Sequence, residues 1–408
     1  MSNQHPSTFV QADPVDVYKL IEEDLLYACD ILPYAKDDTY RSSNDYRFSK
    51  GAALGLLAKV YATWAGYPIQ DTSKWEAAAK TARILVESGK HDLLNDYEQL
   101  WKNTCNGIWD PTESLIEISF YSPTYSGNSD PVGRIGKWNG VKTTVDAGRS
   151  GSTAANVQVV HSFVLDWREE AKPDETTGIS PDRRQNLSIA NYKHGHNDSK
   201  TGAVYLDDYY LAASIPNDNA ATALSKDLDP EKSQKAKQTY TPAKWDIDKY
   251  MESIPFINND KSTVNWYVLR YADVLLLYAE ALNEWKGGPT TEAYAAINKV
   301  RKRGYTKADG TINKDYSLKE GLDQTAFREA VHKERAYELA FEGHRRLDLV
   351  RWGVYYETVQ NTYNALKNWW SSANYVVYDY TEKGKHELMP IPQREMDLCT
   401  QFEQNPGW

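Results

Sequence analysis

The sequence predicts a mainly α chain built from repeat-like helix pairs, with a loop-rich insertion that contains short strands. Two observations favour this fold class. Both ends of the chain carry segments in which apolar residues recur at helical spacing between capping and terminating residues. Between them, residues 105–262 are rich in Gly, Asn, Asp, Ser and Pro. Loops on a rigid frame often carry function, so we divide the chain into residues 1–104, 105–262 and 263–408.

Three helices are predicted in the first part of the chain. Residues 15–32 have a helical apolar stripe, with Asp13 as N-cap, Pro14 in the first turn and Pro33 as the stop. The other two predicted helices run from Ser49 to Gly66 and from Thr72 or Ser73 to Gly89.

The same design returns later in the chain. The segment VLRYADVLLLYAEALNEWKG predicts a long helix ending at Gly287, and TTEAYAAINKVRKRG predicts its partner, ending at Gly304. The dipeptides Tyr61-Ala62 and Tyr278-Ala279 each precede a Trp, a Gly stop, a short loop and an Ala-rich helix. This similarity indicates a tetratricopeptide-like arrangement of helix pairs. In the insertion, LIEISF alternates like a strand and NVQVVHSFVLDW fits one further helix.

Composition excludes several classes. The formal charge is -10 and there is no long Lys/Arg run, which argues against nucleic-acid binding. The N-terminus has no signal-peptide pattern and no window resembles a membrane span, so the chain as given is expected to be soluble. The three cysteines lie far apart and show no zinc-ligand spacing. We expect no cofactor.

Motifs for catalysis are scarce. The chain has no nucleotide-binding glycine loop, no nucleophile elbow and no HExxH. Glu329 and His332 form one ExxH pair, whereas a helical di-iron site needs two. His194 and His196 lie in a polar segment, where solvation is more common than metal binding. We therefore expect no metal site.

The segment FREAVHKERAYELAFEGHRRLDLVRWG concentrates charge. Glu334, Glu338 and Glu342 share one predicted helical face, ended by Gly343. A carboxylate pair across a cleft could hydrolyse glycosides. Nearby arginines depress carboxylate pKa values and disfavour a general acid. The favoured interpretation is a structural ion-pair network of Glu334, Arg335, Glu338, Glu342, Arg345, Asp348 and Arg351.

The same segment resembles a known family. KERAYELAFEGHRRLDLVRWG is similar to a signature of the SusD/RagB family, outer-membrane nutrient-binding lipoproteins of Bacteroidetes-type bacteria. Further blocks follow in the family's order: LRYADVLLLYAEALNE, AINKVRKRG and the C-terminal PIP and QNPG motifs. SPDRRQNLSI resembles a DPR segment, with Asp182 and Arg183 matching.

The resemblance implies a right-handed superhelix of helix pairs. It also implies non-catalytic capture of an oligosaccharide or polysaccharide at the outer face of the outer membrane. The implied partner is a TonB-dependent transporter of the SusC type. Family members usually start with a lipoprotein signal, a lipidated cysteine and more helices, so about a quarter of a typical member is expected to be missing before Val15.

A sugar site needs aromatic platforms edged by polar groups. The chain has 13 Trp and 29 Tyr but only 8 Phe. Trp64, Trp75, Trp285 and Trp352 lie in helical stripes and are expected in the core. The preferred site is on the loop FYSPTYSGNSDPVGRIGKWNG, with Trp138 as first platform, Tyr125 as second, and Asn128, Asp130 and Arg134 as polar partners. Alternative platforms are Trp109, Tyr209, Tyr210, Trp245 and Trp266. The adjacent Trp369 and Trp370 are either a second platform or an anchor at a helix end.

Three hypotheses remain at this point. The first is glycan capture, the second is a protein interaction scaffold without a glycan site, and the third is a glycoside hydrolase. Glycan binding without turnover would favour the first hypothesis, and binding to a membrane protein alone would favour the second. Release of reducing sugar would favour the third.

Overall fold

The computed structural model confirms the mainly helical fold class. It describes residues 9–120, 133–143, 151–174, 179–197, 200–205, 240–252, 260–313, 316–369 and 376–408. The first part contains α1 (Pro14–Ile31), α2 (Lys50–Trp64), α3 (Lys74–Glu87) and α4 (Tyr97–Cys105). The helices α9 (Tyr271–Lys286), α10 (Thr291–Gly304), α11 (Gln324–Glu338) and α12 (Arg345–Arg351) complete the helical body. Among the described helices, none is long and apolar enough to cross a bilayer.

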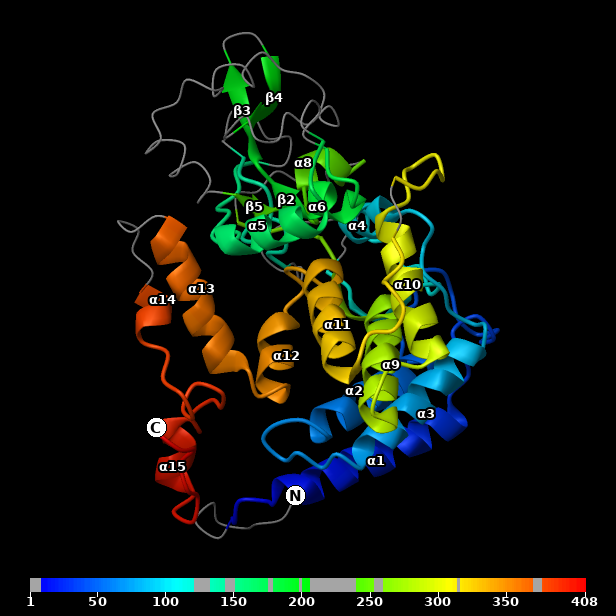
Figure 1. The fold of residues 1–408 in the computed structure, drawn as a ribbon, viewed down its shortest axis with the longest axis vertical. Helices are drawn as coiled ribbons and strands as arrows, with labels where there is room; N and C mark the ends of the chain where they lie inside the picture. The colour runs from blue at the N-terminus through cyan, green and yellow to red at the C-terminus, as the bar shows by residue number, and fades with distance from the viewer. Residues whose placement is uncertain are drawn as a thin grey trace.

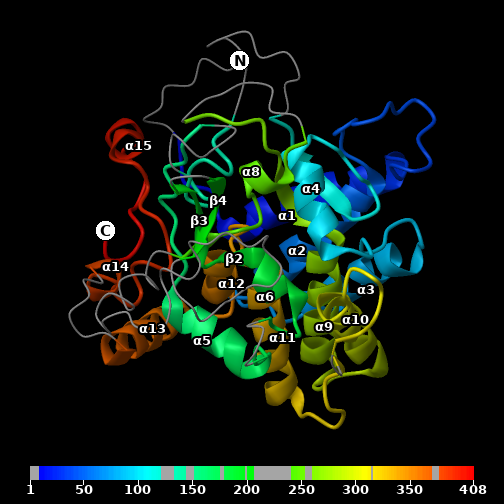
Figure 2. The ribbon, with the colours of Figure 1, turned by 90° about the horizontal axis from the view of Figure 1, so that it is seen from above.

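The smaller elements lie at two edges of this body. The middle of the chain supplies β1 (Ser114–Ile118), α5 (His161–Glu170), α6 (Arg183–Ser188), β2 (Ile189–Ala190), β3 (Tyr192–Asn197), β4 (Lys200–Tyr205), β5 (Thr241–Pro242), α8 (Ile247–Tyr250) and β6 (Trp266–Arg270). The chain ends with α13 (Tyr355–Trp369), α14 (Val376–Asp379) and α15 (Gln393–Leu398). Figure 1 shows β3 and β4 at one end of the molecule and α13–α15 as a separate column beside the body. Figure 2, seen from above, also places this column at one side.

Local sequence signals account for the helix boundaries. The Asp13 carboxylate accepts from the Val15 amide at 2.7 Å, and the Ser49 hydroxyl accepts from the Ala52 amide at 3.4 Å, so both predicted caps are confirmed. Gly287 ends α9 in the left-handed conformation at φ 73°. Ser73 occupies the cap position of α3, but its side chain makes no capping hydrogen bond.

The predicted start of the fourth helix was wrong. Residues 266–270 form the strand β6, which pairs antiparallel with β1, and α9 begins at Tyr271. The aromatic and β-branched residues of WYVLR suit an extended strand. Because β1 lies in the predicted insertion, this pairing ties the insertion to the helical body.

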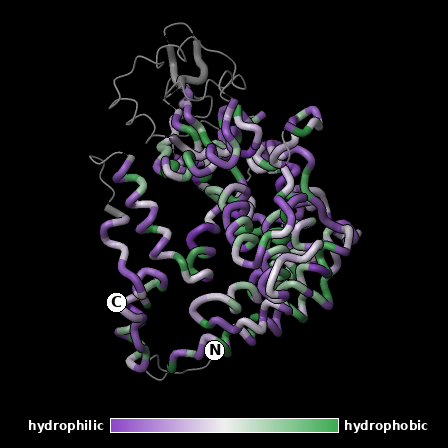
Figure 3. Tube along the Cα trace, viewed as in Figure 1, coloured by the Kyte–Doolittle hydropathy of each residue, from purple (hydrophilic) through white to green (hydrophobic). Residues whose placement is uncertain are grey.

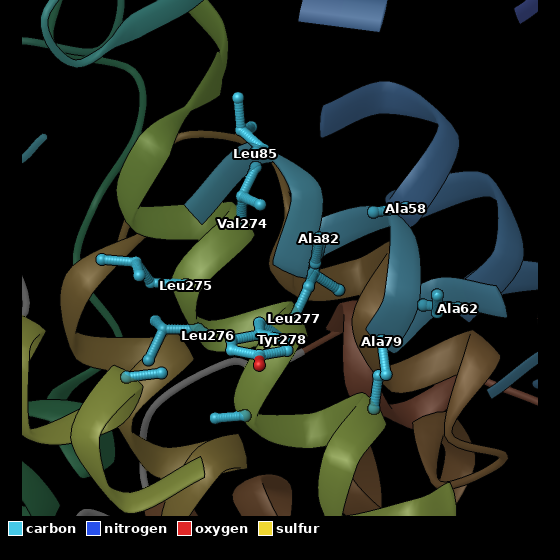
Figure 4. Close-up of a cluster of buried hydrophobic side chains, with 14 of the residues drawn as sticks. Ala58, Ala62, Ala79, Ala82, Leu85, Val274, Leu275, Leu276, Leu277 and Tyr278 are labelled. Carbon is cyan, nitrogen blue, oxygen red and sulfur yellow. The ribbon is translucent and has the colours of Figure 1, made fainter. Parts of the chain in front are cut away.

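The helix pairs share one core. Alanines of α2 and α3 face the leucines of α9, and this close approach is visible in Figure 4. The hydropathy colouring of Figure 3 places much of the apolar chain in this layer. Gly55 allows the contact, since a Cβ there would lie 3.0–3.1 Å from Leu269, Leu115 and Val274.

A second core joins all three predicted segments. Trp101 from α4, Trp245 from the insertion and Tyr267 from β6 are each at most 3% exposed. The Trp101 ring meets both other rings edge to face. A third cluster combines Trp167 of α5 with Tyr337 of α11, whose rings stack at 4.8 Å. The described part of the insertion is therefore packed onto the helices.

Candidate functional site

An exposed tryptophan stands on a tight turn between β1 and α5. The Trp138 side chain is 42% exposed. Its backbone amide and that of Lys137 both donate to the Arg134 carbonyl, at 3.0 and 3.1 Å. Gly136 has φ 78°, and a Cβ there would come within 2.7 Å of Ile247. Only glycine therefore fits between this turn and α8.

Neighbouring residues hold the turn from the inside. Lys137 is 1% exposed, and its ammonium group lies 3.4 Å from the carbonyl oxygens of Gly151 and Ser152. Burial lowers the pKa of Lys137 to about 8, although the negative charge of Asp248 acts to raise it. The amide of Asn156 donates to the Trp138 carbonyl at 2.7 Å. The backbone beneath the indole is thus fixed while the ring faces outward.

Polar side chains surround the Trp138 ring. The indole N–H donates to Asp260 Oδ1 at 2.9 Å, and the Arg134 guanidinium lies 4.5 Å from the ring centroid. Arg134 also pairs with Asp260 at 3.1 Å. The carboxylate thus lies at the edge of the indole and the guanidinium over one of its faces. An aromatic ring with polar groups beside it suits sugar rings, because these present apolar C–H faces and hydroxyl rims. We call Arg134, Trp138 and Asp260 the Trp138 platform.

A second aromatic group lies where the α1–α2 connection meets the end of α4. The Trp109 amide donates to Asn44 Oδ1 at 2.9 Å, Arg41 lies 5.2 Å from its ring, and Tyr46 lies 6.1 Å from it. Trp109 is partly buried. We call Arg41, Tyr46 and Trp109 the Trp109 platform.

One extended segment, residues 260–265, links the two platforms. Asp260 belongs to the Trp138 platform, and the Ser262 amide donates to the Gly133 carbonyl at 2.9 Å. At the other end, Asn265 donates to the Tyr46 hydroxyl and to Glu117 Oε1, both at 2.9 Å. Six residues of chain span at most about 20 Å. The two platforms are therefore close enough for one extended ligand to reach both.

Glu117 beneath this segment is an unusual carboxyl group. It is 6% exposed and accepts from Ser114 Oγ at 2.7 Å. Burial raises its pKa to about 7, although the hydrogen bonds from Ser114 and Asn265 favour the charged form. Its hydrogen bonds position Asn265, and through it Tyr46, rather than point the carboxyl to solvent.

The structure separates the remaining predicted platform residues. Trp245 is 1% exposed, in edge-to-face contact with Trp101 and stacked on Trp266 at 5.0 Å. The prediction that Trp245 presents a sugar platform was wrong, because the second core covers its ring. Trp266 is partly buried, with Trp245 against one face. The other predicted site residues lie outside the part of the chain that the structure describes: Tyr125, Asn128, Asp130, Tyr209, Tyr210, Trp370 and the side chain of Trp369.

The family-signature glutamates lie in a buried ion-pair network. Glu338 is fully buried and contacts Arg303, Arg270 and Arg184 at 2.6, 3.0 and 3.1 Å. Arg184 also contacts Glu334 at 2.5 Å, and Glu342 pairs with Arg270 and Lys244. α11 ends at Glu338, so Glu342 follows a turn rather than continuing the helix as the sequence analysis expected. The turn contains Phe341 at φ 69° and still returns Glu342 to the network.

A second network starts from Arg335, the residue next to Glu334 on α11. Arg335 contacts Asp273 at 2.7 Å and Asp348 at 2.9 Å, and Asp348 also pairs with Arg351. Arg345 does not join either network. It is exposed and donates to the His332 carbonyl at 3.1 Å, so its predicted role was wrong.

Electrostatics make these carboxylates poor general acids. Burial alone would raise the pKa of Glu338, but Arg303, Arg270 and Arg184 outweigh burial and hold it well below its usual range. The pKa of Glu342 is likewise lowered, as Arg270 and Lys244 outweigh burial. These groups stay ionised and paired.

The candidate metal ligands also have other contacts. His194 Nε2 lies 2.8 Å from Asp246 Oδ1, and His332 stacks on Trp352 with ring centroids 3.4 Å apart. The side chain of His196 lies outside the described part of the chain. Over the described residues, no group of three or more His, Cys, Asp or Glu side chains is arranged to hold a metal ion.

Sequence reasoning missed several residues of these sites. Asp260, Arg41 and Tyr46 come from outside the predicted loop, and the buried Arg184, Arg270 and Arg303 come from outside the charged segment. The DPR-like segment could have indicated Arg184, because it contains both Arg184 and Asp182, and these two side chains form an ion pair at 2.8 Å.

The described residues form a scaffold of helix pairs with the aromatic side chains of Trp138 and Trp109 on its loops. Residues 112–408 match the SusD family. Because the match covers more than half of the chain, the chain belongs to the SusD family, as the resemblance predicted.

Several relatives show the extent of this similarity. A SusD homolog from Bacteroides thetaiotaomicron VPI-5482, known from a crystal structure, is 67% identical, with a TM-score of 0.87 over 100% of this chain and 72% of that one. A laminarin binding SusD-like protein is 26% identical, with a TM-score of 0.61 over 98% of this chain and 70% of that one. SusD-like protein P25 of Formosa agariphila is 26% identical over 88% of this chain but only 58% of its own length.

Proposed function

We propose that this chain binds an oligosaccharide or polysaccharide without cleaving it. The observation that carries the proposal is the Trp138 platform: an exposed indole on a rigid turn, with its N–H oriented by Asp260 and a guanidinium over its ring. Family membership supports the choice of ligand, since one relative of the same fold is named for laminarin binding.

The proposed mechanism is stacking with edge hydrogen bonds. A sugar ring packs on the open part of the indole, and its hydroxyls exchange water for Asp260 and Arg134. The Trp109 platform adds a second contact for a longer chain. Much of the hydrogen bonding only replaces water, so we expect a Kd of about 10 μM to 1 mM, or roughly -4 to -7 kcal/mol.

The environment of the described carboxylates near the platforms and in the signature segment supports binding without turnover. Glycoside hydrolysis needs a proton donor and a second carboxylate on either side of the bond. Glu338 and Glu342 are buried and held ionised by arginine and lysine, and Glu117 is enclosed by Ser114 and Asn265.

We further propose that the bound glycan is handed to a TonB-dependent transporter of the SusC type at the outer face of the outer membrane. Membership in the SusD family supports this partner and this location.

A glycan array followed by calorimetry tests the proposal. We expect binding to at least one polysaccharide class, with no reducing sugar released during incubation. Release of reducing sugar would identify a hydrolase. Binding to the transporter with no glycan binding on the array would identify an interaction scaffold.

A further inference from the structure

The guanidinium group of the Trp138 platform is already paired with a carboxylate. The side chains of Arg134 and Asp260 are each 49% exposed, and their charged groups lie 3.1 Å apart. Asp260 also accepts from the indole N–H of Trp138 at 2.9 Å. The ring therefore has one positive and one negative group beside it, and these two charges balance.

The Trp109 platform shows the same balance. Arg41 lies 3.7 Å from each of two carboxylates, those of Asp38 and Asp45, and its side chain is only 5% exposed. Its N–H groups donate to three carbonyl oxygens of the α1–α2 connection at 2.7–3.3 Å. The other guanidinium of this connection, that of Arg47, contacts Asp45 at 2.6 Å. Two arginines thus face two aspartates, and Arg41 donates within its own loop.

The lysines near the Trp138 platform also have contacts within the protein. Lys137 and Lys142 donate to backbone carbonyls of residues 151–154. Lys261, the residue after Asp260, is partly buried and has an interaction of its own. The positive charge of the Trp138 loop is therefore directed largely at its own backbone.

This charge pattern indicates which glycans fit. Sulfate and carboxylate groups bind best where arginine or lysine donors converge without a carboxylate partner. Asp260 instead presents carboxylate oxygens beside the indole, and these accept from hydroxyl groups but repel anions. The stretches 121–132 and 253–259, which lead into this platform in the sequence, contain a single charged residue, Asp130. The formal charge of -10 on the whole chain adds a repulsive field for polyanions.

We propose that the two platforms select polysaccharides without charged groups and discriminate against sulfated and uronate-rich ones. This inference rests on the proposed glycan binding and names the substrate class of that same site. Recognition then depends on ring stacking and on hydroxyl donors that reach Asp260, and not on ion pairs with the ligand.

The test is calorimetric titration of the full chain with uncharged polysaccharides, laminarin among them, and with the partly sulfated derivative of each. Polygalacturonate is the carboxylated probe. We expect the anionic ligands to bind at least about tenfold more weakly than the uncharged ones, since like charges beside the ring repel. The affinity for an uncharged ligand should be the same at low and high ionic strength, because no ion pair forms between ligand and protein.

Two variants separate the effect of charge from that of sulfate bulk. Asp260→Asn removes the negative charge but keeps an oxygen that can accept from the indole N–H. It should reduce the difference in affinity between uncharged and sulfated forms severalfold. The matched control is Glu76→Gln, which removes one negative charge from a half-exposed pair with Lys80 on α3 and should leave that difference unchanged.

Each remaining outcome has a definite meaning. Anionic polysaccharides that bind as tightly as uncharged ones would overturn this inference and leave glycan binding standing. An unchanged difference in Asp260→Asn would also overturn it, since bulk and not charge would then exclude the sulfated forms. If no polysaccharide of either kind binds, the proposed glycan binding itself fails, and this inference fails with it.

Discussion

Glu338 is the centre of the larger buried network, and its removal should be strongly destabilising. Its carboxylate contacts Arg184, Arg270 and Arg303, all at most 6% exposed. Glu338→Ala removes the negative charge that these three guanidinium groups share and leaves positive charge uncompensated in the interior. Breaking a buried ion pair by removing one partner costs about 3–5 kcal/mol.

The assay is urea unfolding followed by tryptophan fluorescence at neutral pH. The control is Glu76→Ala, which breaks an i,i+4 pair with Lys80 whose side chains are 47% and 63% exposed. Such surface pairs contribute about 0.3–0.5 kcal/mol. Glycan affinity should be unchanged in folded Glu338→Ala, since Glu338 lies in the core and the platforms lie on loops.

Two outcomes would refute this reasoning. If Glu338→Ala lost no more stability than Glu76→Ala, the network would not need its central charge. If Glu338→Ala kept its stability but lost glycan binding, the glutamate would be a ligand-contacting residue and not a structural one.

Two further predictions concern the loops. Glu117→Gln should be more stable than the unmodified chain at pH 8, because the folded chain keeps this carboxyl at a pKa of about 7. The rise of this pKa from 4.5 lowers the stability of the unmodified chain by roughly 3 kcal/mol; the loss is absent below pH 4.5 and complete above pH 7. In thermal melts, the difference in melting temperature between the two proteins should vanish near pH 4.5. A difference that does not change with pH would contradict this prediction. Gly136→Ala should weaken glycan binding and stability, since its Cβ would lie 2.7 Å from Ile247 at φ 78°. Gly310→Ala is the control, with φ 85° but no atom near its Cβ; equal effects of the two changes would show that close packing under the Trp138 turn does not matter.

Local signals were sufficient to predict most of the helical frame. Capping at Asp13 and Ser49 and the stop at Gly287 act within a few residues of chain, so the sequence contains them directly. The strand β6 was mistaken for helix because its preference depends on pairing with β1, about 150 residues earlier.

Contacts of the candidate site were predicted only where both residues belong to the same loop. Trp138 and Arg134 are four residues apart, and the structure brings them together. Asp260 reaches the same ring from a segment 122 residues later, which the spacing of residues in the sequence does not reveal. Trp245 was misassigned because a tryptophan in a loop-rich segment can equally be core, and packing against Trp101 decides the matter.

The most direct test of glycan capture is calorimetric titration of Trp138→Ala with the polysaccharide that binds best on the array, laminarin included in the panel. The control is Tyr380→Ala, which removes a 71% exposed aromatic side chain far along the chain from both platforms. The account predicts that Trp138→Ala folds normally and shows no measurable binding, while Tyr380→Ala binds like the unmodified chain. Unchanged binding by Trp138→Ala would contradict the account.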